Sequence, residues 1–192
     1  MRRSLPPLIL ASASPRRRVL LRIFGIPFRV TSPGVDERHR HTRPAGLVAD
    51  NARLKAEWMR GRRSRGLVLS ADTLVTIDGR VLGKPTSAAE ARAMLLRLSG
   101  RVHRVYSGIC FLDLETERVW EAVDSSAVRL RRLSTEEIRR YVASGAAMDK
   151  AGAYAIQDMR WMMVDRIEGS ISTVIGLPLH VVEQGLKRFG VR

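Results

Sequence analysis

The sequence predicts a mixed α/β fold, with one central, partly antiparallel sheet flanked by helices. Segments with strand-like and helix-like patterns alternate along the 192 residues, which is typical of α/β proteins. Two short turns join neighbouring strand-like segments, and such hairpins interrupt a purely parallel order. Hydrophobic residues make up 45% and charged residues 28%, a composition that favours a packed core over disorder. A chain of this length fits one domain or two tightly joined lobes, and we expect a single domain over residues 1–192.

Runs of apolar and β-branched residues mark the strands of this sheet. The dipeptide Asp78-Gly79 is a strong signal for a hairpin turn, and Glu115-Thr116-Glu117 separates two long runs further along. The expected strands are residues 8–11, 27–31, 67–77, 80–82, 102–112, 118–130 and 160–167. The two turns are what makes the sheet partly antiparallel.

Capping residues and apolar residues at helical spacing mark the helices. The first begins at Ser14-Pro15 and ends at Gly25. Two more begin with capping boxes, in which a serine is followed three residues later by a glutamate: Ser87 with Glu90, and Ser134 with Glu137. The side chains expected to face inward on these three helices are Leu20, Ile23, Phe24, Ala91, Met94, Leu95, Leu98, Ile138, Tyr141 and Val142. The remaining helices are expected at residues 45–60 and 179–189.

The charge of the chain is unusual, because 34 basic residues against 19 acidic ones leave a formal net charge of +15. Such an excess favours polyanionic partners, among them nucleotides and nucleic acid. The basic residues are spread along the chain and aromatic residues make up only 5%, so we interpret most of them as solvated arginines and any nucleic-acid binding as non-specific. The few lysines mark candidate positions that need a compact ammonium group. They are Lys55, Lys84, Lys150 and Lys187, of which we expect the last to be a surface residue.

Several classes of protein and site are excluded. The single cysteine, Cys110, allows no intramolecular disulfide, and its apolar neighbours predict a place in the core. No apolar run reaches the roughly 18 residues of a membrane span, so we expect no membrane partner. The first 13 residues resemble a signal peptide only weakly, since two prolines interrupt the apolar stretch, and we expect a cytoplasmic protein. The four histidines lack the spacing of metal ligands and are expected at the surface or in turns: His39, His41, His103 and His180.

An aspartate inside an apolar strand is the strongest sign of chemistry. Asp72 interrupts the run of residues 67–75, and a carboxylate in such a place is costly unless it is paired, bound to a metal or catalytic. A turn residue at the end of a strand is the alternative interpretation. The register of the hairpin that follows predicts that Lys84 lies near Asp72.

Two further segments carry polar residues at places where ligands commonly bind. Residues 12–17 join a strand to a helix and bring together Ser12, Ser14 and two arginines, which predicts an anion site; the alternative is a capped helix with exposed arginines. Residues 149–157 are rich in small side chains that allow a ligand to approach closely, and Gln157 could pair with the edge of a base. Here the alternative is a tightly packed loop.

Taken together and in this order, the segments resemble the Maf family of nucleoside triphosphate pyrophosphatases. The matching stretches span nearly the whole chain, and six in register are highly specific. They are Leu10-Ala11-Ser12-Ala13-Ser14-Pro15-Arg16-Arg17, Gly34-Val35-Asp36-Glu37, Ala71-Asp72-Thr73 with Gly83-Lys84-Pro85, Leu98-Ser99-Gly100 with His103, Asp149-Lys150-Ala151-Gly152-Ala153-Tyr154, and Gly176-Leu177-Pro178-Leu179.

The resemblance implies a fold, a reaction and a place in the cell. Maf proteins are cytoplasmic enzymes with an elongated α/β fold similar to that of inosine triphosphate pyrophosphatases (Ham1-like), with a cleft between two lobes. They hydrolyse a nucleoside triphosphate to the monophosphate and pyrophosphate with a divalent metal, expected here to be Mg²⁺ or Mn²⁺. Family members have also been linked to septum formation. The expected partner is a nucleoside triphosphate, and a homodimer is one assembly open to the chain.

The resemblance also implies roles for individual residues. Asp72 matches the proton acceptor, and Glu37, Lys55 and Lys84 match polar residues of the catalytic cleft. The branch that acts on dTTP and UTP carries the residues found here at Arg16, Thr73 and Gln157, whereas the 7-methyl-GTP branch carries Trp, Gln and Glu. The groups expected to bind phosphate are Ser12, Ser14, Arg17, Lys55, Lys84 and Lys150. Glu37 and Asp72 are the expected oxygen ligands of the metal.

Two other hypotheses stay open. The first keeps the reaction and changes the substrate to another nucleotide, such as 7-methyl-GTP. The second is a basic regulator of cell division that binds nucleic acid through its net charge and gives Asp72 no role.

Overall fold

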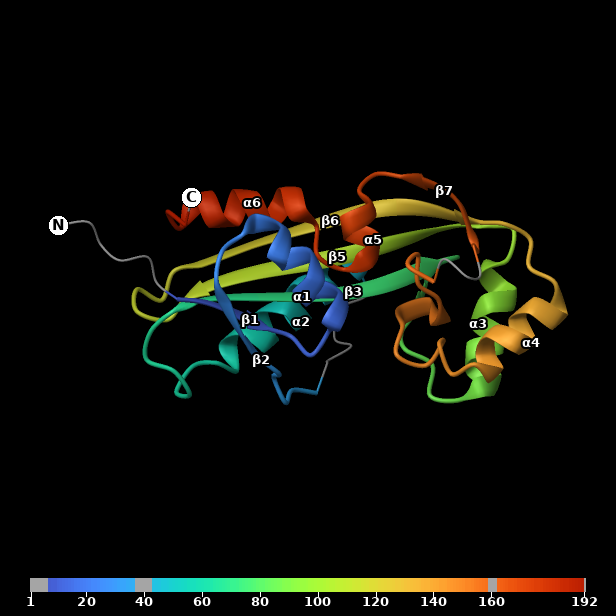
Figure 1. The fold of residues 1–192 in the computed structure, drawn as a ribbon, viewed down its shortest axis with the longest axis horizontal. Helices are drawn as coiled ribbons and strands as arrows, with labels where there is room; N and C mark the ends of the chain where they lie inside the picture. Colours follow the sequence, from blue (N-terminus) through green and yellow to red (C-terminus); the bar gives the residue numbers. More distant parts are fainter. Residues whose placement is uncertain (1–6, 37–42, 159–161, 192) are drawn as a thin grey trace. The chain divides into compact units, whose positions relative to one another are not determined.

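The computed structural model describes residues 7–36, 43–158 and 162–191. Its strands are β1 (Leu8–Ala11), β2 (Phe28–Thr31), β3 (Leu67–Ile77), β4 (Arg80–Leu82), β5 (Val102–Asp113), β6 (Val119–Leu130) and β7 (Val164–Glu168). Its helices are α1 (Pro15–Leu21), α2 (Pro44–Glu57), α3 (Ala88–Leu98), α4 (Thr135–Ala143), α5 (Ile171–Ile175) and α6 (Leu179–Arg188), with 3-10 turns η1 (Arg22–Phe24) and η2 (Ala151–Ala153). Figure 1 shows these elements along the chain.

The strands form one mixed sheet, so the predicted fold class is confirmed. The order is β2-β1-β3-β5-β6-β7, with β4 paired to β3. Strand β1 runs parallel to both β2 and β3, whereas β3–β4 and β6–β7 are antiparallel. The hairpin register pairs Val75 with Leu82, and the pairing ends there, before it reaches Lys84.

The chain divides into two compact units, and strands β3, β5 and β6 each contribute residues to both. The first unit comprises residues 1–72, 107–124 and 176–192, and the second comprises residues 73–106 and 125–175. The boundary on β3 falls between Asp72 and Thr73.

In the first unit, α2 lies against one face of the sheet. Its small side chains Ala52 and Ala56 belong to one buried apolar cluster with Ile9 and Ala11 of β1, and the Ser70 hydroxyl of β3 donates a hydrogen bond of 2.6 Å to the Ala52 carbonyl oxygen. Cys110 lies in the same apolar cluster, where burial raises the pKa of its thiol to about 12. The prediction that this cysteine is a core residue is confirmed.

Helix α6 also packs on strands of the first unit, through a glycine. A Cβ atom built on Gly185 would lie 2.1 Å from Phe111 of β5 and 2.8 Å from Trp120 of β6. The two aromatic rings lie 6.0 Å apart. Phe111 and Cys110 are neighbours on β5 and therefore point to opposite faces, so α2 and α6 cover the two sides of the sheet.

The second unit has its own apolar core between α3, α4 and the adjoining strands. The predicted inward faces of both helices are buried here: Ala91, Met94, Leu95, Leu98, Ile138, Tyr141 and Val142. The capping box at Ser134 and Glu137 is present in full. At Ser87 the serine accepts a hydrogen bond from the Glu90 amide, but the Glu90 carboxylate binds Thr86 instead, so that predicted box is only half formed.

Two other predictions about single elements need correction, and one short helix was not predicted. Ile23 does not face inward, because it lies in the 3-10 turn after α1 and is 67% exposed. The short helix α5 was not expected from the sequence pattern. The last predicted strand, residues 160–167, overlaps β7 only from Val164, and its first two residues lie outside the described part.

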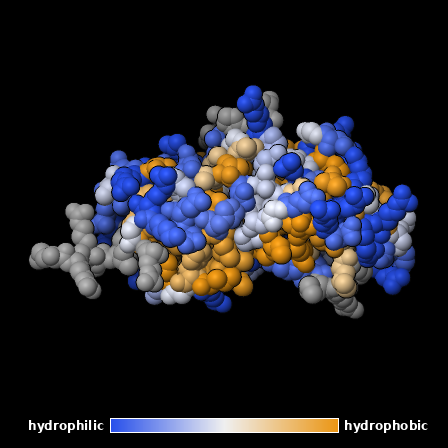
Figure 2. Space-filling view, turned by 90° about the horizontal axis from the view of Figure 1, so that it is seen from above, coloured by the Kyte–Doolittle hydropathy of each residue, from blue (hydrophilic) through white to orange (hydrophobic). Residues whose placement is uncertain are grey.

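Many surface arginines pair with nearby carboxylates, as expected for solvated faces. Glu136 accepts hydrogen bonds from both Arg139 and Arg140, and these contacts lower its pKa to about 2. Figure 2 shows hydrophilic residues over much of one face, with hydrophobic areas between them. Solvent screens exposed pairs of this kind, so they contribute little to stability.

His103 is buried rather than exposed, and the prediction of a surface or turn residue is wrong. Its side chain is in the second unit with 3% exposure, and its Nε2 lies 2.6 Å from the Tyr154 hydroxyl. Its Nδ1 is buried and has no hydrogen-bond partner among the described residues. Burial lowers the pKa of His103 to about 4.

This lowered pKa predicts an acid-sensitive fold. Between pH 6.5 and 4 the unfolded chain binds a proton at this histidine and the folded chain does not. The free energy of unfolding therefore has its full value above pH 6.5 and falls as the pH drops toward 4. The contribution lost is up to about 3 kcal/mol. Urea unfolding across this pH range should give a shallower pH dependence for His103→Gln than for the wild type. Parallel curves would contradict the assignment.

Candidate active site

The carboxylate of Asp72 is buried in β3, with 6% exposure, and both of its oxygens accept a hydrogen bond. Its Oδ1 accepts a hydrogen bond from Lys55 Nζ at 2.6 Å, and its Oδ2 accepts one from Asn51 Nδ2 at 3.2 Å. Lys55 is itself 7% exposed. The sequence argument that an aspartate in this strand needs a partner is thereby satisfied inside the first unit.

Helix α2 supplies both partners of Asp72 from one face. Asn51 and Lys55 are four residues apart and therefore lie one above the other on the helix surface. The helix approaches the sheet closely at Gly108 of β5. A Cβ atom built on this glycine would lie only 2.3 Å from the carbonyl oxygen of Val48. A glycine on β5 thus allows α2 to come near enough for its polar side chains to meet Asp72.

The turn between β1 and α1 brings together the serines predicted to bind an anion. Ser12 is buried, with 3% exposure, and its hydroxyl accepts hydrogen bonds from the Ser14 amide at 3.2 Å and from Arg17 Nη1 at 3.3 Å. Ser14 caps α1 by accepting a bond from the Arg17 amide at 3.4 Å. The two serines and Arg17 form one hydrogen-bonded cluster at the carboxyl end of β1.

Arg17 also connects this cluster to the strand that carries Asp72. Its Nη1 donates to the carbonyl oxygen of Ala71 at 2.8 Å, and its Nε donates to the carbonyl oxygen of Gly176 at 2.8 Å. Because Ala71 directly precedes Asp72, the guanidinium fixes the backbone beside the buried carboxylate. Arg16, its neighbour on α1, is half-buried.

Several residues singled out from the sequence therefore lie in the first unit. Lys55 contacts the Asp72 carboxylate directly, and Arg17 joins the cluster of Ser12 and Ser14 to the backbone beside Asp72. Glu37, the other expected metal ligand, lies outside the described residues. No group of three or more histidine, cysteine, aspartate or glutamate side chains that could hold a metal ion occurs within residues 7–36, 43–158 and 162–191.

The second unit holds Thr73, Lys84, Lys150 and Gln157. Lys84 and Gln157 are exposed, and Thr73 is half-buried. Lys150 Nζ donates to the carbonyl oxygen of Ala146 and, at 2.7 Å, to Asp149 Oδ1. The lysine is thus held against its own loop.

The loop that carries Gln157 is anchored at the residue after it. Asp158 is half-buried; its Oδ2 accepts a hydrogen bond from the Tyr141 hydroxyl and lies 4.0 Å from Lys150 Nζ. Burial, followed by this contact, raises the pKa of Tyr141 above its ordinary value. Gly152 adopts φ +69°, and a Cβ there would lie 3.1 Å from Val75 of β3, so the loop packs closely on the strand.

Sequence reasoning missed Asn51. Its signal was its spacing, since it stands four residues before one of only four lysines, on the helix predicted at residues 45–60. A polar residue at 3% exposure on that face is the second partner of the carboxylate.

Comparison with known proteins identifies the class from the fold. The Ham1 protein of Staphylococcus aureus matches 95% of this chain and 98% of its own with a TM-score of 0.54 at 13% identity, which defines a Ham1-like α/β fold. The sequence is more specific. A family model described as Maf-like protein matches residues 7–189, and the chain belongs to the Maf family.

Relatives of this family are similar over nearly their whole length. A dTTP/UTP pyrophosphatase of Symbiobacterium thermophilum is 48% identical over 95% of this chain and 94% of its own. Enzymes of the same name from Thermotoga maritima and Dictyoglomus thermophilum are 44% and 41% identical, over 95% of this chain and 89% and 96% of theirs. The part of the chain that the structure describes contains no helix long and apolar enough to cross a membrane.

Proposed function

We propose that this protein is a nucleoside triphosphate pyrophosphatase that hydrolyses dTTP and UTP in the cytoplasm, with the whole chain acting as one catalytic domain. The observation that carries the proposal is the buried Asp72 carboxylate, held on both oxygens by Lys55 and Asn51. The choice of substrates is supported by the relatives of 41–48% identity that bear this name.

In the proposed reaction, Asp72 accepts a proton from the water that attacks the α-phosphorus. The bond from the water oxygen to this phosphorus forms, and the bond from the phosphorus to the bridging oxygen of the β-phosphate breaks, which releases monophosphate and pyrophosphate. Because α2 holds both carboxylate oxygens, the base is oriented before the substrate arrives. Such preorganisation lowers the barrier without a cost at the moment of reaction.

Cations and hydroxyls bind the triphosphate in this proposal. Ser12, Ser14 and Arg17 form the cluster at the end of β1, and their polar hydrogens suit phosphate oxygens. Lys55, Lys84 and Lys150 supply compact positive charges. Lys150 would exchange its bond with the exposed carboxylate of Asp149 for a phosphate oxygen, a substitution of one anion for another.

A divalent cation fits the donor set. Asp72 offers carboxylate oxygens, which Mg²⁺ and Mn²⁺ prefer, and Mg²⁺ is often bound by one or two carboxylates together with substrate phosphates. Each oxygen of Asp72 accepts one hydrogen bond, from Asn51 or Lys55, and a carboxylate oxygen has a further lone pair. We propose Asp72 and Glu37 as ligands. When bound, the ion neutralises charge on the phosphates and the departing pyrophosphate.

Base recognition is assigned to Arg16, Thr73 and Gln157. The amide of Gln157 offers a donor and an acceptor, which matches the O4 and N3–H edge of thymine and uracil. We expect Gln157→Glu to lower kcat/KM for dTTP at least about tenfold, because a carboxylate only accepts and leaves one polar group of the base unpaired. Steady-state pyrophosphate release measures the effect.

The matched control is Gln184→Glu, the same chemical change at an exposed position of α6. Its kcat/KM should equal that of the wild type. Equal dTTP turnover by Gln157→Glu and the wild type would remove Gln157 from base recognition.

The overall proposal is tested by pyrophosphate release from a panel of nucleotides: dTTP, UTP, CTP, GTP, 7-methyl-GTP and ITP, with Mg²⁺ or Mn²⁺. The expected result is preferential turnover of dTTP and UTP. Turnover led by 7-methyl-GTP or a purine nucleotide would replace the substrate and keep the reaction. No turnover of any nucleotide by folded protein would overturn the reaction itself.

A further inference from the structure

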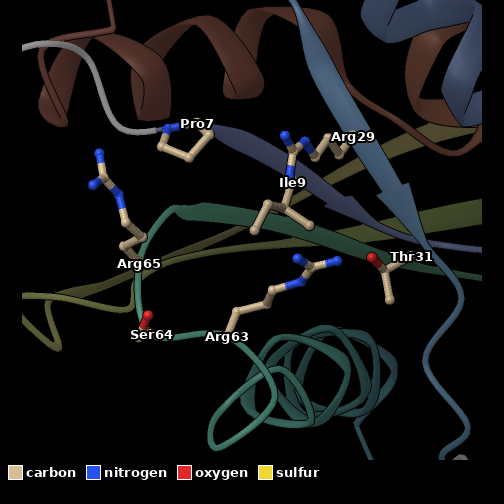
Figure 3. Close-up of a pocket in the computed structure, with 7 residues that line it drawn as sticks. All are labelled: Pro7, Ile9, Arg29, Thr31, Arg63, Ser64 and Arg65. Atoms are coloured by element: carbon tan, nitrogen blue, oxygen red, sulfur yellow. The ribbon is translucent and has the colours of Figure 1, made fainter.

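A pocket of about 340 Å³ lies in the first unit, outside the residues assigned to catalysis. Its lining comes from β1 with the residue before it, from β2, and from the turn between α2 and β3 (Figure 3). The seven lining residues are Pro7, Ile9, Arg29, Thr31, Arg63, Ser64 and Arg65. This volume falls in the range of small-molecule sites.

The sheet register explains why the pocket is there. Ile9 is paired with Arg29 and Ala11 with Thr31, so these four side chains lie on the same face of the sheet. On β1 this face is covered by α2, since Ile9 and Ala11 pack on its alanines. Strand β2 is the edge of the sheet, and Arg29 is exposed there. This face of the sheet is therefore apolar on β1 and carries a cation, Arg29, and a hydroxyl, Thr31, on the edge strand β2.

The charge of the pocket is one-sided. Three guanidinium groups and two hydroxyls line it, and none of the seven residues is acidic. Within the described part of the chain, no ion pair joins Arg29, Arg63 or Arg65 to a carboxylate. By contrast, Glu57 pairs both with Arg53, on α2, and with Arg60, just after this helix. Figure 3 shows Arg63 extending toward Thr31 across the space. Three like charges around one hollow repel one another and favour an anionic occupant.

The apolar wall limits what this anion can be. Of the two apolar lining residues, Pro7 is exposed and Ile9 is 4% exposed, so a ligand meets this wall mainly at Pro7. Guanidinium groups bind phosphate through two parallel hydrogen bonds, and an apolar wall favours a ring next to that phosphate. Guanidinium groups beside an apolar wall therefore suit a small molecule that carries both a phosphate and a ring.

The pocket is distinct from the cluster around Asp72. Strands β1 and β3 are parallel; Ser12 and Asp72 lie toward their carboxyl ends, whereas Pro7 and Arg65 precede them. The four residues of β1 rise about 13 Å from one end to the other. Thr31 is the lining residue at the carboxyl end, opposite Ala11, but it lies on the edge strand β2, which β1 separates from β3 and Asp72. A ligand held by Arg29 against Pro7 therefore lies toward the amino ends of the strands, away from Asp72.

We propose that this pocket is a second, non-catalytic site that binds a nucleoside monophosphate, with the phosphate on Arg29 and Arg63 and the base against Pro7, beside Ile9. The proposal draws on the proposed function only for the expectation that the protein meets such nucleotides. Thr31 and Ser64 donate further hydrogen bonds to the ligand.

The test is calorimetric titration with UMP at low ionic strength. The variant Arg29→Gln/Arg63→Gln removes two charges from exposed side chains, and Arg22→Gln/Arg188→Gln removes the same charge from exposed positions of the same unit outside the pocket. We expect two sites in the wild type and in the control, and at least about tenfold weaker binding at one of them in the pocket variant. Inorganic phosphate should bind the pocket more weakly than UMP, because it lacks the ring.

The possible outcomes separate the two proposals. If the catalytic assignment fails and the pocket is correct, the wild type binds one equivalent of UMP and the pocket variant binds it at least about tenfold more weakly. If the pocket assignment fails, wild type, control and pocket variant titrate alike, and Arg29 is then an edge-strand charge of the kind that prevents sheet-to-sheet aggregation. Loss of oligo-dT binding in the pocket variant, with UMP binding unchanged, would likewise overturn the proposal and assign the pocket to nucleic acid.

Discussion

Replacing Asp72 with asparagine is expected to lower kcat for dTTP by at least about a hundredfold, since a positioned general base contributes roughly 10²–10⁴. Asparagine preserves the shape of the side chain and removes its capacity to take a proton from water. Release of pyrophosphate from dTTP, measured at saturating metal, reports the effect. Asp78→Asn is the matched control: this aspartate lies just beyond the same strand, is half exposed and pairs with Arg101, so its turnover should be unchanged.

The stability of the variant must be separated from its chemistry. Asp72 neutralises Lys55 in a buried pair, and removal of one partner from such a pair costs about 3–5 kcal/mol. A second variant, Asp72→Asn with Lys55→Gln, replaces this ion pair with two neutral side chains. We expect it to recover stability in urea unfolding and to stay inactive. Recovery of turnover in this double variant would show that Asp72 is not the base.

Local signals in the sequence were sufficient for most of the fold. The turn at Asp78-Gly79 and the capping box at Ser134 act within a few residues, and both are found where the sequence predicts them. Short-range chemistry of this kind is independent of the rest of the chain. Ile23 was wrongly placed because a 3-10 turn, with three residues per turn instead of 3.6, ends α1 and rotates it toward solvent.

The candidate site was only partly predictable, for a different reason. Asp72 could be found because an acidic residue in an apolar strand is costly on its own. Its contact with Lys55 spans 17 positions, and its position depends on how closely α2 approaches β5. The same limitation explains His103, whose burial against Tyr154 involves a partner 51 positions away. The hydropathy pattern along the chain does not show which distant residues come into contact, so it could not place Lys55 beside Asp72 or Tyr154 beside His103.

Gly108 sets how closely α2 approaches the sheet, and its replacement should have the second large effect, on stability and on turnover. In Gly108→Ala the new methyl group would lie 2.3 Å from the Val48 carbonyl oxygen and 2.9 Å from the Ala49 amide nitrogen. Both atoms belong to the helix backbone, so no side chain can turn aside and α2 must move outward. Overpacking of this kind costs about 1–3 kcal/mol or more. We expect a loss of stability in that range by urea unfolding.

The displacement should also reach the chemistry, because Asn51 and Lys55 move with the helix. A shift of about 1 Å at the group that orients a base can cost about a hundredfold in rate, so the folded fraction of Gly108→Ala should turn over dTTP much more slowly than the wild type. Gly34→Ala is the control, since a Cβ there meets nothing within 4 Å, and its unfolding midpoint should match the wild type. If Gly108→Ala retained both wild-type stability and wild-type turnover, the close contact of α2 with β5 would not be what positions Asp72.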